Sequence, residues 1–278
     1  MAYATLNKVK HYYEWVCDSS KGHRPILVFL HGWGGSARYW ESTAQAMKDD
    51  FDCLLYDLRG FGRSAAADNT TLEFDTLESF ADDLNQLLNF LELERVHIVA
   101  HSMGSSVALY FLQRYSHRVK KAILTSSGSF DYDKRTFEAF HQFGRYVVLF
   151  RPSWLVKIPL VPKVFMARFL RKQIPYSDKR VFLKDFLEAD TATSIATLKA
   201  SVSKHATEVM PQAFSSIDVP TLMVSGQYDK ITPAELGRRA ASLNTAIEYF
   251  EITETGHFPM LEDSKTYLSV IRDFLHCS

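Results

Sequence analysis

One serine stands between two small residues, at a point where the sequence pattern changes from a buried strand to a helix. Ser102 lies in the segment Val99-Ala100-His101-Ser102-Met103-Gly104-Ser105. A sharp strand-to-helix turn needs small side chains two positions before and after its centre, because the flanking backbones would otherwise collide, and it exposes the central hydroxyl. Such a hydroxyl can act as a nucleophile. The alternative interpretation is that Ser102 only caps the N-terminus of the helix.

A nucleophilic serine needs a histidine as base and a carboxylate that orients the histidine. His257 lies in a loop between the last predicted strand and the last predicted helix, and Gly256 allows this loop to turn toward the serine. Asp229 follows the strand predicted at 220–224, so its carboxylate should reach the same end of the sheet as Ser102. Asp131 and Asp133, which follow the preceding strand, are the competing candidates for the acid.

An acyl-transfer site also needs donors for the oxygen that becomes negatively charged during attack. The backbone amide of Met103 follows the nucleophile at a helix N-terminus, and that of Trp33 follows His31-Gly32 in the first loop of the sheet. We predict these two amides as the oxyanion hole. His31 is interpreted first as a brace for this loop and second as part of the substrate pocket.

The elements that must position these residues alternate between strands and helices. Apolar runs predict strands at 25–30, 53–58, 96–100, 122–125, 220–224 and 247–252, and amphipathic patterns predict helices at 37–48, 76–91, 103–115 and 263–275. Strands separated by helices imply crossover connections, so the predicted fold class is α/β, with a mostly parallel central sheet flanked by helices. The alternating segment 9–16 predicts an additional antiparallel strand.

The pattern changes after the strand predicted at 122–125. Residues 129–210 contain no convincing buried strand, and prolines divide them into helical stretches. Because 278 residues are few for two independent domains, we predict one core with an insertion. The first part of the core is residues 1–128, a helical cap is residues 129–210, and the second part of the core is residues 211–278.

Part of the cap is both apolar and basic. Between residues 146 and 171 apolar residues alternate with five lysines and arginines, and no acidic residue occurs. The apolar side chains could simply pack the cap onto the core while the cations stay solvated. Alternatively, they line an apolar pocket over Ser102, for which Trp154, Phe165 and Phe258 are the candidates, and the basic rim contacts an anionic head group or, weakly, a membrane surface.

Composition and cysteine content restrict the possible partners and the compartment. The chain has 32 basic and 32 acidic residues, so no bulk attraction to nucleic acid is expected. Cys17, Cys53 and Cys277 form neither a metal-binding spacing nor a disulfide framework. Since the N-terminus lacks the pattern of a secretory signal, we expect a cytoplasmic protein. The sequence does not determine the oligomeric state.

Five segments together resemble the α/β-hydrolase superfamily. They are His31-Gly32-Trp33-Gly34-Gly35, Asp57-Leu58-Arg59-Gly60-Phe61-Gly62-Arg63-Ser64, Ala100-His101-Ser102-Met103-Gly104, Gly226-Gln227-Tyr228-Asp229 and Gly256-His257. Each follows or ends a predicted strand, in the order of the family. Ala100 and Ser105 depart from the family, which often has glycine there, but both are small. The resemblance implies an α/β-hydrolase fold with a helical cap, a triad of Ser102, Asp229 and His257, and no metal or cofactor.

The resemblance also implies a reaction class. We expect a serine hydrolase that cleaves a carboxylic ester of a small or medium-chain acyl substrate through an acyl-enzyme on Ser102. The same triad serves thioesterases, amidases, carbon–carbon bond hydrolases and a menaquinone-pathway lyase, and some relatives act as ligand receptors with slow turnover. These alternatives remain open at the level of sequence.

Overall fold

The computed structural model describes residues 2–17, 24–66 and 76–276 of the chain, so Cys277 lies outside the described residues. Cys17 is exposed and Cys53 is buried, and both are free thiols. Within the described segments, no helix combines the length and the hydrophobicity that crossing a membrane requires. The cytoplasmic location stays a prediction.

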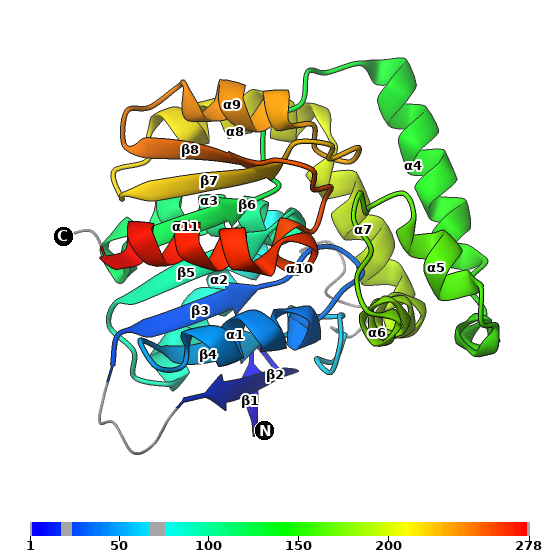
Figure 1. Ribbon diagram of the computed structural model, residues 1–278, viewed down its shortest axis with the longest axis horizontal. Helices are drawn as coiled ribbons and strands as arrows, with labels where there is room; N and C mark the ends of the chain where they lie inside the picture. The colour runs from blue at the N-terminus through cyan, green and yellow to red at the C-terminus, as the bar shows by residue number, and fades with distance from the viewer. Residues whose placement is uncertain (1, 18–23, 67–75, 277–278) are drawn as a thin grey trace.

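The described residues form one eight-stranded sheet in the order β1-β2-β4-β3-β5-β6-β7-β8. The strands are β1 Ala2–Leu6, β2 Val9–Val16, β3 Ile26–Leu30, β4 Asp52–Tyr56, β5 Val96–His101, β6 Val119–Thr125, β7 Thr221–Gly226 and β8 Ile247–Ile252. β1 pairs antiparallel with β2 and β2 antiparallel with β4, whereas every pairing from β4 to β8 is parallel. The predicted mostly parallel α/β fold is confirmed (Figure 1).

The N-terminal strand β1 was not predicted. It forms a hairpin with β2 through Asn7 and Lys8, whose φ angles are 48° and 68°. Asparagine tolerates this left-handed conformation and is the signal that could have revealed the turn. Lysine in place of the usual glycine at the second turn position concealed it.

Helices cover both faces of the sheet (Figure 1). On one face lie α2 (Leu77–Phe90), α3 (Met103–Tyr115), α8 (Lys204–Ser215) and α9 (Ala234–Ala241), and on the other lie η2 (Ala37–Trp40), α1 (Glu41–Met47) and α11 (Ser264–His276). Successive residues of β5 belong to the apolar cores on opposite faces of the sheet, because strand side chains alternate between faces. Ile98 and Ala100 pack under α3, and Val99 packs on the side of α1 and α11.

Helix α2 illustrates how the local sequence determines an element. The Thr76 hydroxyl accepts a hydrogen bond from the amide of Ser79 at 3.3 Å and so caps the first turn. Buried residues then recur at helical spacing, at positions 77, 80, 81, 84, 87 and 88. This single apolar stripe faces the sheet.

The cap follows β6 and covers the carboxyl ends of the parallel strands (Figure 1). Its elements are α4 (Lys134–Leu149), η5 (Ser153–Lys157), α5 (Val161–Met166), α6 (Tyr176–Glu188) and α7 (Thr191–Ser201). The expected end of the cap at residue 210 falls inside α8, and Met210, Ala213 and Phe214 of that helix belong to the main core cluster. The bounds of the cap stay a prediction.

Candidate active site

Ser102 lies in the tight turn between β5 and α3. Its φ and ψ angles of 53° and −120° are strained for a residue with a side chain. Gly104 is required two positions later, because a Cβ atom there would lie 2.5 Å from the carbonyl oxygen of His31. The Ser102 hydroxyl makes no capping hydrogen bond to α3. The structure therefore gives no support to the alternative interpretation of Ser102 as a helix cap.

A chain of hydrogen bonds connects Ser102 to a buried carboxylate. Ser102 Oγ lies 3.1 Å from His257 Nε2, and His257 Nδ1 lies 2.7 Å from Asp229 Oδ2. The other oxygen, Asp229 Oδ1, accepts the backbone amides of Ile231 at 2.8 Å and Thr232 at 3.0 Å. A carboxylate can only accept a hydrogen bond, so His257 Nδ1 carries the imidazole hydrogen and the lone pair of Nε2 faces the serine hydroxyl.

The competing acids lie elsewhere. The side chain of Asp131 is 82% exposed and pairs with Arg239 at 2.9 Å. Asp133 caps α4 by accepting the amides of Arg135 and Thr136. Neither carboxylate contacts His257, whereas Asp229 does.

The loops that carry the acid and the base touch each other. They leave the adjacent strands β7 and β8, and a Cβ atom on Gly226 would lie 1.9 Å from the carbonyl oxygen of Gly256. Glycine at 226 is what permits this approach.

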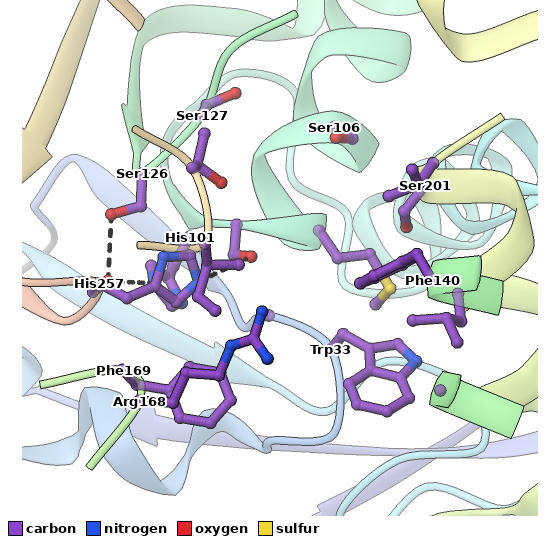
Figure 2. A pocket seen from close by; sticks show the side chains of 18 of the residues that line it. Trp33, His101, Ser106, Ser126, Ser127, Phe140, Arg168, Phe169, Ser201 and His257 are labelled. Carbon is purple, nitrogen blue, oxygen red and sulfur yellow. Dashed lines mark hydrogen bonds between the residues drawn. The ribbon is translucent and has the colours of Figure 1, made fainter. Parts of the chain in front are cut away.

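Three groups hold the backbone of His257, and we did not predict any of them. The His257 carbonyl oxygen accepts hydrogen bonds from Ser126 Oγ at 3.0 Å and from His101 Nε2 at 2.8 Å (Figure 2). The His257 amide donates to the carbonyl oxygen of Phe169 in the cap at 2.7 Å. Burial, and next the neighbouring His257, lower the pKa of His101 well below its ordinary value. A neutral His101 can accept from Tyr39 at Nδ1 and donate at Nε2.

A buried glutamate links the His257 loop to the cap. Glu262 Oε1 accepts the amides of Gly256 at 2.9 Å and Phe258 at 3.2 Å. Its Oε2 accepts the amides of Arg171 at 2.6 Å and Lys172 at 2.8 Å. Glu262 lies in α10 (Pro259–Glu262) and carried no signal in the sequence, because these partners are distant in the chain.

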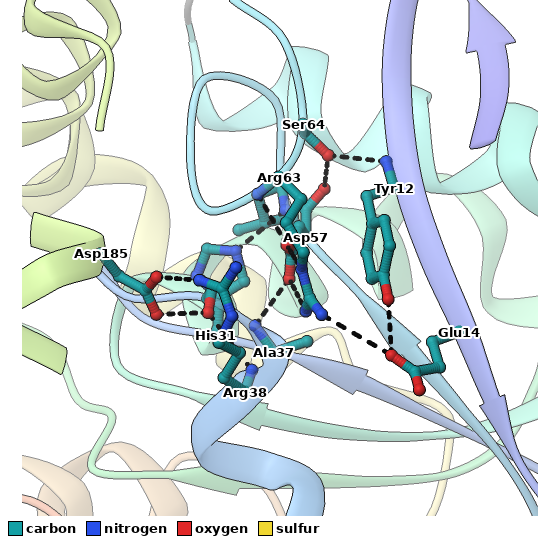
Figure 3. A network of polar contacts seen from close by, with 11 residues as sticks. Tyr12, Glu14, His31, Ala37, Arg38, Asp57, Arg63, Ser64 and Asp185 are labelled. Atoms are coloured by element: carbon teal, nitrogen blue, oxygen red, sulfur yellow. Dashed lines mark hydrogen bonds and ion pairs between the residues drawn. The ribbon is translucent and has the colours of Figure 1, made fainter. Parts of the chain in front are cut away.

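Hydrogen bonds of the buried His31 side chain hold the loop that leads to Trp33 (Figure 3). His31 donates from Nδ1 to the carbonyl oxygen of Gly32 and accepts the amide of Leu58 at Nε2, both at 2.9 Å. Burial lowers the pKa of His31, so the ring stays neutral. His31 is fully buried and does not line the cavity described below. Its role as a brace agrees with these contacts, and the structure gives no support to its assignment to the substrate pocket.

A second brace centres on Asp57, whose carboxylate accepts the amides of Ala37 and Arg63, both at 2.8 Å. Burial alone would raise the pKa of Asp57, but hydrogen bonds and charge from the Arg63 guanidinium outweigh it and lower the pKa. The cap contributes Asp185 of α6, which bonds Ser36 and Arg38 (Figure 3). Burial raises the pKa of Asp185 to about 6.

A cavity of about 390 Å³ opens over Ser102 between the core and the cap. Serines surround its floor, and aromatic side chains from the cap form most of its walls, namely Phe140, Phe143, Phe165, Phe169, Phe182 and Phe186. The cavity also includes Trp33, Met103 and Phe258. Phe165 and Phe258 were predicted for the pocket. Trp154, predicted for the pocket as well, lies on η5, is 55% exposed and does not line the cavity, so the structure gives that prediction no support.

Charge is nearly absent from the cavity. Of the described residues that line it, Arg168 alone is a lysine or arginine, and Figure 2 shows its side chain pointing into the cavity. Within the described segments, no group of three or more histidine, cysteine, aspartate or glutamate side chains is arranged to hold a metal ion. The site thus combines an apolar cavity with a serine and a histidine in its lining and a buried carboxylate behind the histidine.

Residues 25–264 match the family model described as the alpha/beta hydrolase fold. The chain belongs to the α/β-hydrolase family. Among curated relatives, the proline iminopeptidase of Heyndrickxia coagulans is 26% identical and the match covers 93% of each chain. The 3-oxoadipate enol-lactonase 1 of Acinetobacter baylyi is 22% identical over 90% of this chain and 88% of its own. The solved structure of an esterase from Exiguobacterium antarcticum has a TM-score of 0.81 at 19% identity and covers 99% of both chains.

These α/β-hydrolase relatives act on different bonds according to their names. The match to the family model establishes the family, and the likeness to the solved structure establishes the fold alone. The reaction must be argued from the site of this chain.

Proposed function

We propose that this α/β-hydrolase cleaves a carboxylic ester of an apolar, medium-chain acyl group through an acyl-enzyme on Ser102. The observation that carries the proposal is the chain of contacts from Ser102 to His257 and Asp229 at the floor of an apolar cavity. The esterase and lactonase names among the relatives support the same class.

In the proposed reaction His257 Nε2 takes the proton of Ser102 as Oγ attacks the ester carbonyl carbon. Asp229 stabilises the imidazolium that forms, and His257 then gives the proton to the leaving alcohol oxygen as the carbon–oxygen bond breaks. Water attacks the acyl-enzyme in the second half, again with His257 as base, and releases the carboxylic acid. Ser126, His101 and Phe169 act as positioning groups, because they fix the backbone of His257.

The amides of Trp33 and Met103 are the proposed donors to the oxyanion. Met103 is the first residue of α3, so its amide has no partner within the helix and lies at the positive end of the helix dipole. Gly32 and Ser102 approach closely, since a Cβ atom on Gly32 would lie 3.1 Å from Ser102 Cβ. The loop before Trp33 and the turn before Met103 are therefore neighbours, as a shared oxyanion site requires.

Substitution of the nucleophile tests the proposal. Ser102→Ala should lower kcat/KM for p-nitrophenyl esters by about 10⁴-fold or more, because nucleophile and base act as a unit. It should also abolish labelling by a fluorophosphonate. Ser106→Ala is the matched control, since Ser106 is another α3 serine in the cavity lining and makes no hydrogen bond to His257. Labelling retained in Ser102→Ala, or lost equally in both variants, would refute Ser102 as the nucleophile.

The bond that is cleaved is tested in parallel. Butyryl groups presented as an oxygen ester, a thioester and an anilide differ in the leaving group alone, and we expect the highest kcat/KM for the oxygen ester. A higher value for the thioester would reassign the protein to the thioesterases. A single turnover without sustained release of product would indicate a ligand receptor.

A further inference from the structure

The outer side of the cap carries large apolar side chains in contact with solvent. We define the cap apolar face as Phe143, Tyr146, Phe150, Trp154, Leu160 and Val164. Phe150, Leu160 and Val164 are 74%, 68% and 70% exposed, more than most apolar residues in a folded protein. These residues lie on α4, η5 and α5 or directly beside their ends, at the edge of the cap (Figure 1).

The cap apolar face is one continuous surface. Residues 143, 146 and 150 follow helical spacing along α4, and the rings of Tyr146 and Phe150 stack 6.3 Å apart. Tyr146 and Phe150 also line a groove of about 360 Å³ together with Leu155 and Val161, which come from the segments that carry Trp154, Leu160 and Val164. A large exposed apolar surface of this kind marks a contact site.

The chain segment that carries this face holds charged residues of one sign. The segment 139–177 contains seven lysines and arginines and no acidic residue, although the whole chain is neutral. Arg151 is buried against the carbonyl oxygens of Phe186 and Ala189, while Arg171 and Lys172 pair with acidic groups of the core. Four cations remain exposed, and the described residues offer no hydrogen-bond or ion-pair partner to their side chains, namely Arg145, Lys157, Lys163 and Arg168.

The cap apolar face also reaches the mouth of the cavity over Ser102. Phe143 belongs to both, and Val147, Phe165 and Phe186 separate the cavity from the outer groove, because they line each of them. Arg168 lies at the same mouth. A surface that covers this face would therefore lie next to the cavity over Ser102.

We propose that the cap apolar face docks on an anionic lipid bilayer, with Tyr146, Trp154 and their apolar neighbours entering the interface and the exposed cations Arg145, Lys157 and Lys163 contacting lipid phosphates. Aromatic and aliphatic side chains interleaved with lysine and arginine are the chemistry of interfacial binding. A second copy of this chain fits less well. A twofold interface would place the same patch opposite itself, and unpaired cations would then repel each other.

Vesicle sedimentation of the full chain tests this proposal. The probes are vesicles of phosphatidylcholine alone and of phosphatidylcholine mixed with phosphatidylglycerol. We expect pelleting with the mixed vesicles, weaker pelleting with the neutral ones, and release as salt is raised. Leu160→Ser/Val164→Ser should weaken partitioning onto the mixed vesicles by about tenfold, and Lys157→Gln/Lys163→Gln by a similar factor.

Matched controls alter the same residue types on the core. Leu243 is 43% exposed near the amino end of β8, and Lys8 and Lys120 are exposed on the core. Leu243→Ser and Lys8→Gln/Lys120→Gln should partition like the wild type, and all variants should hydrolyse soluble p-nitrophenyl acetate normally. Ser102→Ala should also pellet like the wild type, so this test does not depend on the proposed reaction.

Three results would overturn the proposal. They are absence from every vesicle pellet, equal weakening by the core controls, and equal binding to neutral and anionic vesicles. Sedimentation velocity, which measures the oligomeric state, could give a fourth contradicting result. A dimer that Leu160→Ser/Val164→Ser dissociates would make the cap apolar face an interface between copies.

Discussion

The role of Asp229 can be tested by exchanging one oxygen atom for an amide nitrogen. Two backbone amides, of Ile231 and Thr232, point at Asp229 Oδ1. In Asp229→Asn they would hold the side-chain oxygen at that position, because an amide nitrogen there would face two donors. The new NH₂ group must then face His257 Nδ1. His257 Nδ1 becomes an acceptor, its hydrogen moves to Nε2, and Nε2 no longer accepts the proton of Ser102.

The expected loss follows from this reversal of the tautomer. We predict that Asp229→Asn lowers kcat for p-nitrophenyl butyrate by about 10⁴-fold, which corresponds to about 5.5 kcal/mol of transition-state stabilisation. The thermal unfolding midpoint should change little, since Oδ1 keeps both backbone donors. Stopped assays of hydrolysis and the rate of fluorophosphonate labelling measure the effect.

Asp131→Asn is the control for this prediction, since Asp131 is exposed and bonded to Arg239. We expect it to change kcat by less than about twofold, as for other surface substitutions. A loss of less than about tenfold in Asp229→Asn, or a larger loss in Asp131→Asn, would refute the role of Asp229 in fixing the tautomer of His257.

Two further predictions concern the cavity and the core. In a series of p-nitrophenyl esters from acetate to palmitate, kcat/KM should rise by about threefold or more for every two carbons up to a medium-chain optimum. Gly144→Val should move this optimum to shorter chains, because a Cβ atom at 144 lies 2.3 Å from Leu198 Cδ2 in the cavity wall; an unchanged profile would contradict the assigned acyl pocket. Burial, and next the charge of Arg59, lower the pKa of His11 from 6.5 to about 4, so the unfolded chain binds a proton at higher pH than the folded protein. The contribution of His11 to the free energy of unfolding, from urea titrations, should therefore fall by up to about 3 kcal/mol as the pH is lowered from 6.5 to about 4, and His11→Gln should reduce the pH dependence by that amount; an equal slope in both proteins would exclude a contribution from His11.

Local sequence patterns were sufficient to predict most of the strands and helices. The strands β7 and β8 were predicted within two residues at each end, because a run of apolar residues between turn signals is a short-range property. The tight strand-to-helix turn at Ser102 could also be predicted from the sequence, because small residues two positions before and after the serine are what such a turn requires. The hairpin of β1 was missed, because the Asn7-Lys8 turn lacks the glycine that usually marks it.

Sequence order placed Asp229 ahead of Asp131, but only distance in space separates the two carboxylates. Both follow a parallel strand, and nothing local to either residue states which strand end faces His257. The register of β7 against β8 and the contact between Gly226 and Gly256 bring Asp229 to the histidine, while Asp131 turns outward to Arg239.

The pocket shows the same limit. The apolar residues interleaved with cations in residues 146–171 do not reveal which side chains face inward, so the prediction named both Phe165, which lines the cavity, and Trp154, which does not. Glu262, Ser126 and His101 escaped notice because each acts through backbone atoms of segments far away in the chain. The sequence by itself determined the order of the elements and the identity of the reactive groups. The tertiary structure alone decided which groups meet, because hydrogen bonds and cavity walls form between segments that local patterns treat as independent.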